Sequence, residues 1–345
     1  MFPRTTQEPE QGGAVDLELR PTREVSSLFQ LRQVAHQDPH TTPLPTMQLF
    51  SPLVLGAIAV LAIQVDANGV CYDPNHAASG AMDAFTVAAD MKTIASYGFT
   101  SVRTYISKFG PTAMGPIIAA ANLKAALGVP YPQSDYEEQK TAAVSAAKSG
   151  GVSYIFVGNE NLAGASSVPS DMISLITSIK ASVPSSVKVG TVQRNTEVIN
   201  YSGISNWTEL VAACDVLGVN VHPYFTAGTT ADNAINVVRA QWATMESNFG
   251  SKLLLTETGW PSDGSFLGNS GSMAGIETFY NAYQAWSSAM PEKFYFQMFD
   301  TPYKPETFEK SYGLLTSDSQ PKLAIAVNAT TALDAAPGSV HAASS

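Results

Sequence analysis

The sequence predicts a single-domain (β/α)8 barrel, the TIM barrel of the α/β class, on three observations. From Gly69 onward, short apolar runs alternate with longer alanine-rich segments, and this alternation implies parallel strands joined by crossover helices. Eight such units over about 260 residues is the count that closes a barrel. The stretch "GVCYDPNHAASG" holds no G-x-G-x-x-G, the phosphate loop expected after the first strand of an open doubly wound sheet.

Each element is expected where the pattern of apolar residues indicates it. The predicted strands are the short apolar runs at 69–74, 101–106, 124–130, 153–160, 188–193, 216–223, 252–259 and 294–300. The predicted helices are segments with a period near 3.6 residues, such as 81–97, 135–149, 168–182, 229–248 and 272–289.

The chain is expected to divide into four parts. Residues 1–46 are rich in Pro, Gln, Thr and charge, and such a segment is expected to be disordered because it buries too little surface to offset its ordering entropy. Residues 47–67 hold an apolar run that is short for a membrane span, so they are expected to form a secretory signal cleaved near Ala67 or, alternatively, a marginal signal anchor. The barrel domain then covers 68–333, and a flexible polar tail covers 334–345.

Composition excludes several classes of partner. The formal net charge is -10, with 29 acidic and 19 basic residues and no basic cluster, so the positive stripe that nucleic-acid binding requires is missing. The five histidines form no metal-ligand spacing with Cys71 or Cys214, so neither a metal nor another cofactor is expected. With a cleaved signal, no stable membrane insertion is expected either.

Export would make glycosylation and disulfide formation relevant to this chain. The sequons at Asn200, Asn206 and Asn328 would become glycosylation sites and would lie on the surface. The spacing of Cys71 and Cys214 leaves open whether they form a disulfide or remain buried thiols.

Two carboxylates stand at the ends of predicted strands. Glu160 closes the apolar run "SYIFVGNE", and Glu257 follows "LLLT" before a Gly-Trp-Pro turn. The carboxyl ends of barrel strands meet at one rim, where barrel enzymes place their active sites. The fourth and seventh strands therefore direct both acids into one bowl. Each acid alone would also fit a solvated loop or the first turn of a helix.

A pair of carboxylates can cleave a glycosidic bond. One protonates the leaving oxygen while the other attacks the anomeric carbon, and a separation of about 5 to 5.5 Å allows a covalent intermediate and retained configuration. The charge of the ionised nucleophile raises the pKa of the acid, and esterification then removes that charge so that the acid becomes a base.

These motifs resemble the β-1,3-glucanases and glucanosyltransferases of glycoside hydrolase family 17. "FVGNE" is similar to the acid/base motif of that family and "LLLTETGWPSDG" to its nucleophile motif, while "GVCYDP", "NVHPY", "FDTPYK" and "SYGLL" fall in matching order. The resemblance implies that Glu160 is the general acid/base and Glu257 the nucleophile. It places Asn159 where it hydrogen-bonds the sugar 2-hydroxyl, although an Asn there would also suit a turn cap.

Aromatic residues cluster at the predicted strand ends, and flat rings suit the apolar faces of sugars. They are Tyr72, Tyr105, Tyr131, Tyr224, Phe225, Trp260 and Tyr303. Tyr72, Tyr105, Tyr224 and Trp260 are the rings expected to bind substrate, Trp260 and Tyr72 most of all because the motifs fix their positions. The alternative for any single ring is packing at the rim.

Three polar residues complete the predicted substrate site. Arg103 is expected to hold the Glu257 carboxylate or to form a structural ion pair. His222 stands where family members often carry Tyr, and it is expected to donate a hydrogen bond to Glu257. Lys304 is kept from the family pattern, but Thr301 replaces the Glu that often precedes it, so the partner of Lys304 stays open.

The sequence thus predicts a secreted, extracellular or cell-wall-associated monomer that cleaves β-1,3-glucan through a covalent intermediate. A β-1,3-glucanosyltransferase that remodels cell-wall glucan is one alternative, because the motifs do not separate water from sugar as the acceptor. A retaining glycosidase for β-1,4 or β-1,6 glucan or mannan is another. A non-catalytic glucan-binding protein is the third, and it would be expected to lack one of the acids or Asn159.

Overall fold

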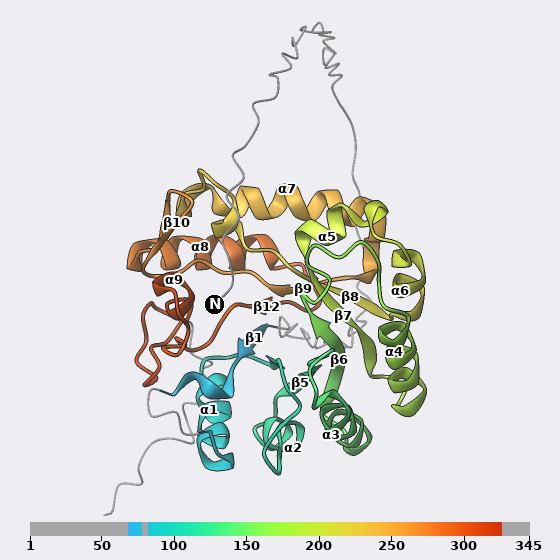
Figure 1. Ribbon diagram of the computed structural model, residues 1–345. Coiled ribbons are helices and arrows are strands. Elements are labelled where there is room, and N and C mark those ends of the chain that lie inside the picture. The colour runs from blue at the N-terminus through green and yellow to red at the C-terminus, as the bar shows by residue number, and fades with distance from the viewer. Residues whose placement is uncertain (1–67, 78–81, 326–345) are drawn as a thin grey trace, which may run out of the picture. The chain divides into compact units, whose positions relative to one another are not determined.

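Eight parallel strands form the barrel at the centre of the computed structural model, which describes residues 68–77 and 82–325 (Figure 1). The strands neighbour one another in the order β12, β1, β2, β5, β6, β7, β8, β9. A parallel bridge between Leu255 and Lys293 brings β9 to the β12 edge, so the barrel is nearly closed, as predicted. The strand bounds are β1 Gly69–Tyr72, β2 Ser101–Thr104, β5 Lys124–Val129, β6 Val152–Asn159, β7 Lys188–Arg194, β8 Val216–Asn220, β9 Leu253–Glu257 and β12 Phe294–Tyr295.

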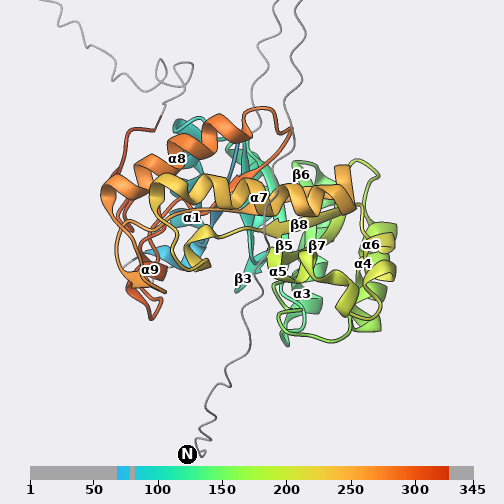
Figure 2. The same ribbon diagram turned by 90° about the horizontal axis from the view of Figure 1, so that it is seen from above.

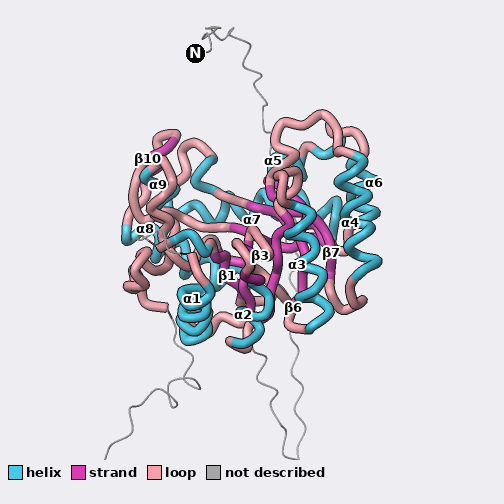
Figure 3. Tube along the Cα trace, turned by 60° about the horizontal axis from the view of Figure 1, so that its bottom comes forward, coloured by secondary structure: helices cyan, strands magenta, loops and turns pink. Residues whose placement is uncertain are grey.

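Helices surround this barrel, as the views in Figures 2 and 3 show. The five predicted helices are confirmed to within a few residues. The helices are α1 Ala84–Ser96, α2 Met114–Ala120, α3 Tyr136–Ser149, α4 Ser170–Ser182, α5 Asn195–Ile199, α6 Trp207–Ala213, α7 Ala231–Phe249, α8 Met273–Ser287 and α9 Thr307–Lys310. Single 3-10 turns lie at Pro74–His76, Tyr201–Gly203, Pro223–Phe225 and Gly250–Lys252.

The elements that the sequence did not predict are short. Helices α2, α5, α6 and α9 span few residues, so no helical period can be recognised in them. Two small hairpins, β3 Lys108–Phe109 with β4 Thr112–Ala113 and β10 Ser265–Phe266 with β11 Asn269–Ser270, also went unpredicted. The eighth barrel strand ends at Tyr295, earlier than predicted. Beyond it the chain still bonds to its barrel neighbours, from Phe296 N to Thr258 O after β9 at 2.9 Å and from Met298 N to Cys71 O in β1 at 3.0 Å.

Side-chain caps begin helices α1 and α8 on the face where the strands end. The Asp83 carboxylate accepts from the amides of Phe85 and Thr86 at 2.8 Å each, and the Ser272 hydroxyl accepts from the Gly275 amide at 3.0 Å. Such caps satisfy amides that have no partner within the helix. They fix the points at which the loops on this face turn back into the helical layer.

Two apolar cores hold the barrel together. The larger fills the space between strands and helices, and the smaller fills the barrel interior with Cys71, Ala126, Phe156, Val192, Val216, Leu254 and Phe294. Gly128 on β5 lets the loop after β2 approach closely, because a Cβ there would lie 2.3 Å from the Tyr105 carbonyl oxygen. This packing directs Tyr105 and Arg103 toward the carboxyl ends of the strands.

The structure answers one question that the sequence left open. Cys71 and Cys214 are free, buried thiols. Asn200 and Asn206 are exposed. Asn328 and the predicted segments 1–46, 47–67 and 334–345 lie outside the described residues. Within the described ranges, no helix combines the length and apolar content needed to cross a membrane.

Candidate active site

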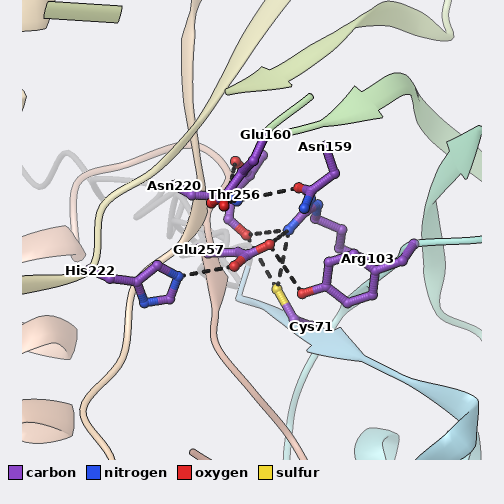
Figure 4. Close-up of polar contacts among 9 residues, drawn as sticks. Cys71, Arg103, Asn159, Glu160, Asn220, His222, Thr256 and Glu257 are labelled. Atoms are coloured by element: carbon purple, nitrogen blue, oxygen red, sulfur yellow. Dashed lines mark hydrogen bonds and ion pairs between the residues drawn. The ribbon is translucent and has the colours of Figure 1, made fainter. Parts of the chain in front are cut away.

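Glu160 and Glu257 lie on the same rim of the barrel, at the carboxyl ends of β6 and β9 (Figure 4). The ladder between β6 and β7 shifts register after Phe156, and the ladder between β8 and β9 shifts after Val219. Irregularities of this kind re-aim side chains where pairing ends. Glu160 itself has a φ of +56°, a left-handed conformation that is uncommon for a residue other than glycine and concentrates at functional sites.

Three donors surround the Glu257 carboxylate, which is 5% exposed. Arg103 Nη1 lies 2.5 Å and Tyr105 Oη 3.1 Å from Oε1, while His222 Nε2 lies 3.0 Å from Oε2. Burial by itself would raise the pKa of Glu257, but the Arg103 charge and the His222 contact outweigh it and lower this pKa to about 2. Glu257 is therefore ionised at neutral pH.

Arg103 connects several parts of the site. Besides Glu257, its guanidinium donates to the Thr256 carbonyl at 3.2 Å and to Asn159 Oδ1 at 2.7 Å, and it stacks over the Tyr105 ring at 4.8 Å. The side chain is 2% exposed. Burial disfavours its charge, yet the Glu257 carboxylate raises the pKa of Arg103 above its ordinary value. The buried charge is thus paired with a carboxylate, which is what makes burial of a guanidinium tolerable.

The Glu160 carboxylate has a poorer set of donors. Asn220 Nδ2 donates to Oε1 at 2.8 Å, and Oδ1 of the same Asn220 side chain accepts from Thr256 Oγ1 at 2.9 Å. Burial and the nearby Glu257 charge raise the pKa of Glu160, and the Asn220 hydrogen bond opposes them only in part. Figure 4 shows Asn220 and Thr256 beside the two acids. Because Thr256 immediately precedes Glu257, Asn220 couples the positions of both carboxylates.

A cleft of about 910 Å³ contains both acids. Of the residues predicted for the site, those that line this cleft are Tyr105, Asn159, Glu160, His222, Glu257 and Lys304. Lys304 Nζ lies 5.3 Å from the centre of the exposed Tyr303 ring. Thr301, which replaces the glutamate often found in the family, is buried and bonds to Gln297 and to the Glu309 carbonyl.

Three predicted sugar-binding rings lie elsewhere. Trp260, Tyr72 and Tyr224 are each fully buried and do not line the cleft. The Tyr72 hydroxyl donates to Asp90 at 2.6 Å, and Trp260 packs edge-on against Tyr224 with ring centres 4.9 Å apart. The prediction that these rings contact a ligand is wrong, because large rings at the strand ends fill the space between barrel and helices. The alternative of rim packing holds for them.

Several cleft residues were not predicted as site residues. Asn220 stands two residues before His222 in "NVHPY", a signal that could have identified it because alternate residues of a strand share a face. Arg194, whose partly exposed side chain pairs with buried Glu197 at 2.5 Å, carried no such signal. Phe225, which belongs to the aromatic cluster noted in the sequence but was not among the rings chosen for substrate contact, also lines the cleft. No group of three or more His, Cys, Asp or Glu side chains suited to a metal ion occurs in the part of the chain that the structure describes.

A barrel with one glutamate at the end of its fourth strand and another at the end of its seventh defines the class of glycoside hydrolases that work with paired carboxylates. A sequence model described as the BtgE/BtgC glycoside hydrolase domain matches residues 69–313. The chain belongs to this family. The resemblance to glycoside hydrolase family 17 that the motifs indicated is thereby confirmed.

Two curated relatives illustrate the similarity. The "Probable beta-glucosidase btgE" of Aspergillus flavus is 34% identical over 204 residues, which cover 58% of this chain and 34% of the relative. The "Probable family 17 glucosidase SCW10" of Saccharomyces cerevisiae is 26% identical over 261 residues, 73% of this chain and 65% of the relative. The chain thus spans about a third of the length of the btgE relatives that it matches.

Solved structures agree on the fold. The glycoside hydrolase family 17 β-1,3-glucanosyltransferase from Rhizomucor miehei has a TM-score of 0.63 and 22% identity, covering 76% of this chain and 98% of its own. An endo-laminarinase from Formosa has a TM-score of 0.62 and 17% identity, covering 73% of this chain and 84% of its own. At these identities the likeness establishes the barrel fold.

Proposed function

We propose that this protein hydrolyses β-1,3-glucan with retention of configuration, through a covalent glycosyl-enzyme intermediate. The observation that carries the proposal is the opposite perturbation of two acids in one cleft: the pKa of Glu257 is lowered to about 2 and that of Glu160 is raised. Two carboxylates with separated pKa values divide the roles of nucleophile and acid between them.

In the first half-reaction, ionised Glu257 attacks the anomeric carbon while protonated Glu160 gives its proton to the leaving oxygen. Arg103 and His222 keep Glu257 ionised and orient it for attack. Esterification of Glu257 removes the charge that raises the pKa of Glu160. Glu160 then accepts a proton from the water that releases the sugar, so one pair of acids serves both steps.

Asn159 is proposed to bind the sugar 2-hydroxyl, a contact that strengthens at the transition state. Its Oδ1 already accepts from Arg103 at 2.7 Å and from Asn220 at 3.3 Å. These two bonds fix which end of the amide accepts. The N–H end is then left to donate to substrate.

The substrate assignment rests on the names of similar proteins. The Formosa neighbour is named an endo-laminarinase and the R. miehei neighbour a β-1,3-glucanosyltransferase. The second name keeps transfer to another glucan as the alternative outcome of the same intermediate. A non-catalytic glucan-binding role is disfavoured, because Asn159 and both acids are in place.

Export, with an extracellular or cell-wall location, is proposed together with this substrate, and the exposed sequons at Asn200 and Asn206 would suit it. The monomeric state stays a prediction.

Product analysis tests the proposal. Purified protein is incubated with a β-1,3-linked glucose hexasaccharide, and chain lengths and anomers are followed by chromatography and NMR, with Glu257→Gln as the inactive control. Shorter products in the β configuration are expected. Products longer than the hexasaccharide would assign transfer instead. Release of sugar from β-1,4 or β-1,6 glucan or mannan, with none from β-1,3-glucan, would contradict the substrate assignment.

A further inference from the structure

Exposed apolar side chains in this protein belong to the catalytic face. Among the described residues, the large apolar side chains that are exposed are Met82, Phe85, Phe225, Phe266, Leu267, Met273 and Tyr303. Every one of them lies in a segment that follows the carboxyl end of a barrel strand: β1, β8, β9 or β12. Exposed apolar groups gathered in one region, rather than scattered singly, indicate an interaction site.

Three of these side chains extend from the cleft onto the β10–β11 hairpin. Phe225 lines the cleft and is 45% exposed, and its ring centre lies 5.6 Å from that of Phe266, which is 39% exposed. Both rings rest on the buried ring of Phe308 in α9, at 5.9 and 5.3 Å. Leu267, at the tip of the hairpin, is 54% exposed. Phe225, Phe266 and Leu267 are called the hairpin platform below.

Buried polar contacts hold the hairpin platform in place. The side chain of Asn269 is buried, and its amide donates at 2.8 Å to the carbonyls of both Tyr224 and Thr226, the residues on either side of Phe225. In return, the Tyr224 hydroxyl donates to the Gly264 carbonyl at 2.9 Å. The hairpin and the loop after β8 therefore form one rigid unit. Rings that are fixed before binding lose little entropy when a ligand covers them.

The turn of the hairpin carries an apolar residue where a different residue would suit the backbone conformation better. Leu267 has a φ of +49° and Gly268 a φ of +80°, the conformation of a type I′ turn, for which Asn-Gly is the preferred pair. A Leu is uncommon there because its side chain crowds the left-handed backbone. A sequence selected for turn stability alone would carry Asn at position 267.

We propose that the hairpin platform is a binding surface for the part of a glucan chain that extends out of the catalytic cleft. The inference rests on the proposed function and adds to it a preference for long chains. Pyranose rings present apolar C–H faces that pack on phenyl rings, and Phe225 makes the surface continuous with the cleft that contains both acids. Three side chains are too few for the roughly 800 Å² per partner of a standard protein interface, so a second protein is the poorer occupant.

Two variants test the platform without disturbing the acids. Phe266→Ala removes the outer ring, and Leu267→Asn removes the apolar tip while installing the preferred turn pair. The ratio of kcat/KM for a β-1,3-linked hexasaccharide to that for the trisaccharide is expected to fall about 5- to 10-fold in Phe266→Ala and about 2- to 3-fold in Leu267→Asn. Phe266→Tyr, which keeps a ring, should restore most of the ratio.

Controls separate binding from folding. Leu267→Asn should keep or raise the melting temperature, so a lower ratio in that variant cannot come from a damaged hairpin. Phe85→Ala removes the more exposed ring on α1, which does not line the cleft, and should keep the wild-type ratio. An unchanged ratio in folded Phe266→Ala protein would overturn the platform. So would a wild-type dimer that this variant converts to a monomer.

Binding measured without catalysis distinguishes failure of the platform from failure of the proposed function. In affinity electrophoresis through gels that contain soluble β-1,3-glucan, the wild type should be retarded and Phe266→Ala retarded less. If the wild type cleaves neither oligosaccharide but shows this difference, the platform stands and the proposed reaction does not. Equal retardation of both proteins would refute the platform whether or not the enzyme is active.

Discussion

The surroundings of Glu257 and of Glu160 differ sharply, although both are glutamates at strand ends on one rim. The Glu257 carboxylate accepts hydrogen bonds from an arginine, a tyrosine and a histidine, and the bond from Arg103 measures 2.5 Å. Glu160 receives a single amide hydrogen bond, from Asn220 at 2.8 Å. Both side chains are largely withdrawn from water. Burial raises the pKa of both acids, and the comparison shows that the donors around Glu257 outweigh it whereas the single donor to Glu160 does not.

This difference supports the proposed roles in one direction only. A nucleophile must be ionised at working pH and an acid must hold its proton, and the lowered pKa of Glu257 and the raised pKa of Glu160 favour the proposed nucleophile and the proposed acid. The predictions below test that assignment, beginning with the largest expected effect.

Replacing Glu257 with Ala should reduce activity on polymer by on the order of 10⁵-fold, the scale of removing a nucleophile in other hydrolases. Azide can then enter the vacated space and displace an activated aryl leaving group. A single displacement inverts the anomeric carbon, so the expected product is the α-glycosyl azide, identified by NMR. Near-normal activity of this variant would refute the assignment.

Replacing Glu160 with Ala should reduce the rate of polymer cleavage about 10³-fold, because the sugar leaving group of the polymer is poor and needs a proton from the general acid. Dinitrophenyl glycosides need no such proton, so the first step should survive and the intermediate should accumulate as a burst of phenol. Azide then attacks the glycosyl-enzyme, and the product is the β-glycosyl azide. If Glu257→Ala and Glu160→Ala gave the same anomer of the glycosyl azide, the assignment of one glutamate as nucleophile and the other as acid would be wrong.

Replacing Asn220 with Ala should move the pH profile rather than abolish activity. Glu160 acts while protonated, so kcat/KM falls as the pH rises through its pKa. The Asn220 hydrogen bond lowers that pKa, and its loss should shift the alkaline limb to higher pH, with rates about 10-fold lower from misplaced acids. Thr256→Val, which frees Asn220 but keeps its amide, should shift the limb less. A shift to lower pH would contradict the proposed role.

The smallest effect concerns stability at neutral pH. The raised pKa of Glu160 means that its ionised form is less favourable in the folded than in the unfolded chain, so Glu160→Gln should raise the melting temperature by about 2 °C. Glu257→Gln should lower it, because buried Arg103 loses its counter-charge. Because the pKa of Glu257 is lowered, its ionised form stabilises the fold at pH values above the ordinary pKa of 4.5. This stabilisation is lost as the pH falls toward about 2. Calorimetry at pH 7 and pH 3 measures the melting temperatures of both variants. Equal shifts in melting temperature for Glu160→Gln and Glu257→Gln would contradict the difference between the two acids.

Local patterns were enough to predict much of this site. Glu160 and Glu257 were predicted because each follows an apolar run and stands inside a specific motif, and the strands around them have the length and spacing of a barrel. Arg103 and His222 were expected near Glu257, and the structure places them at 2.5 and 3.0 Å from its oxygens. Asn220 was missed because its importance depends on a contact between β8 and the end of β6.

The sequence by itself determined the fold class and the two acids, because strand and helix periods and the position of a residue at a strand end are properties of short segments. Tertiary structure alone decided that Trp260, Tyr72 and Tyr224 are buried, that Cys71 and Cys214 stay apart, and that Phe225 and Phe266 share one surface. Burial and contact depend on which distant segments pack together, and aromatic rings are equally suited to a core or to a sugar. Only the packed barrel separates these uses, because it alone determines which rings remain in water.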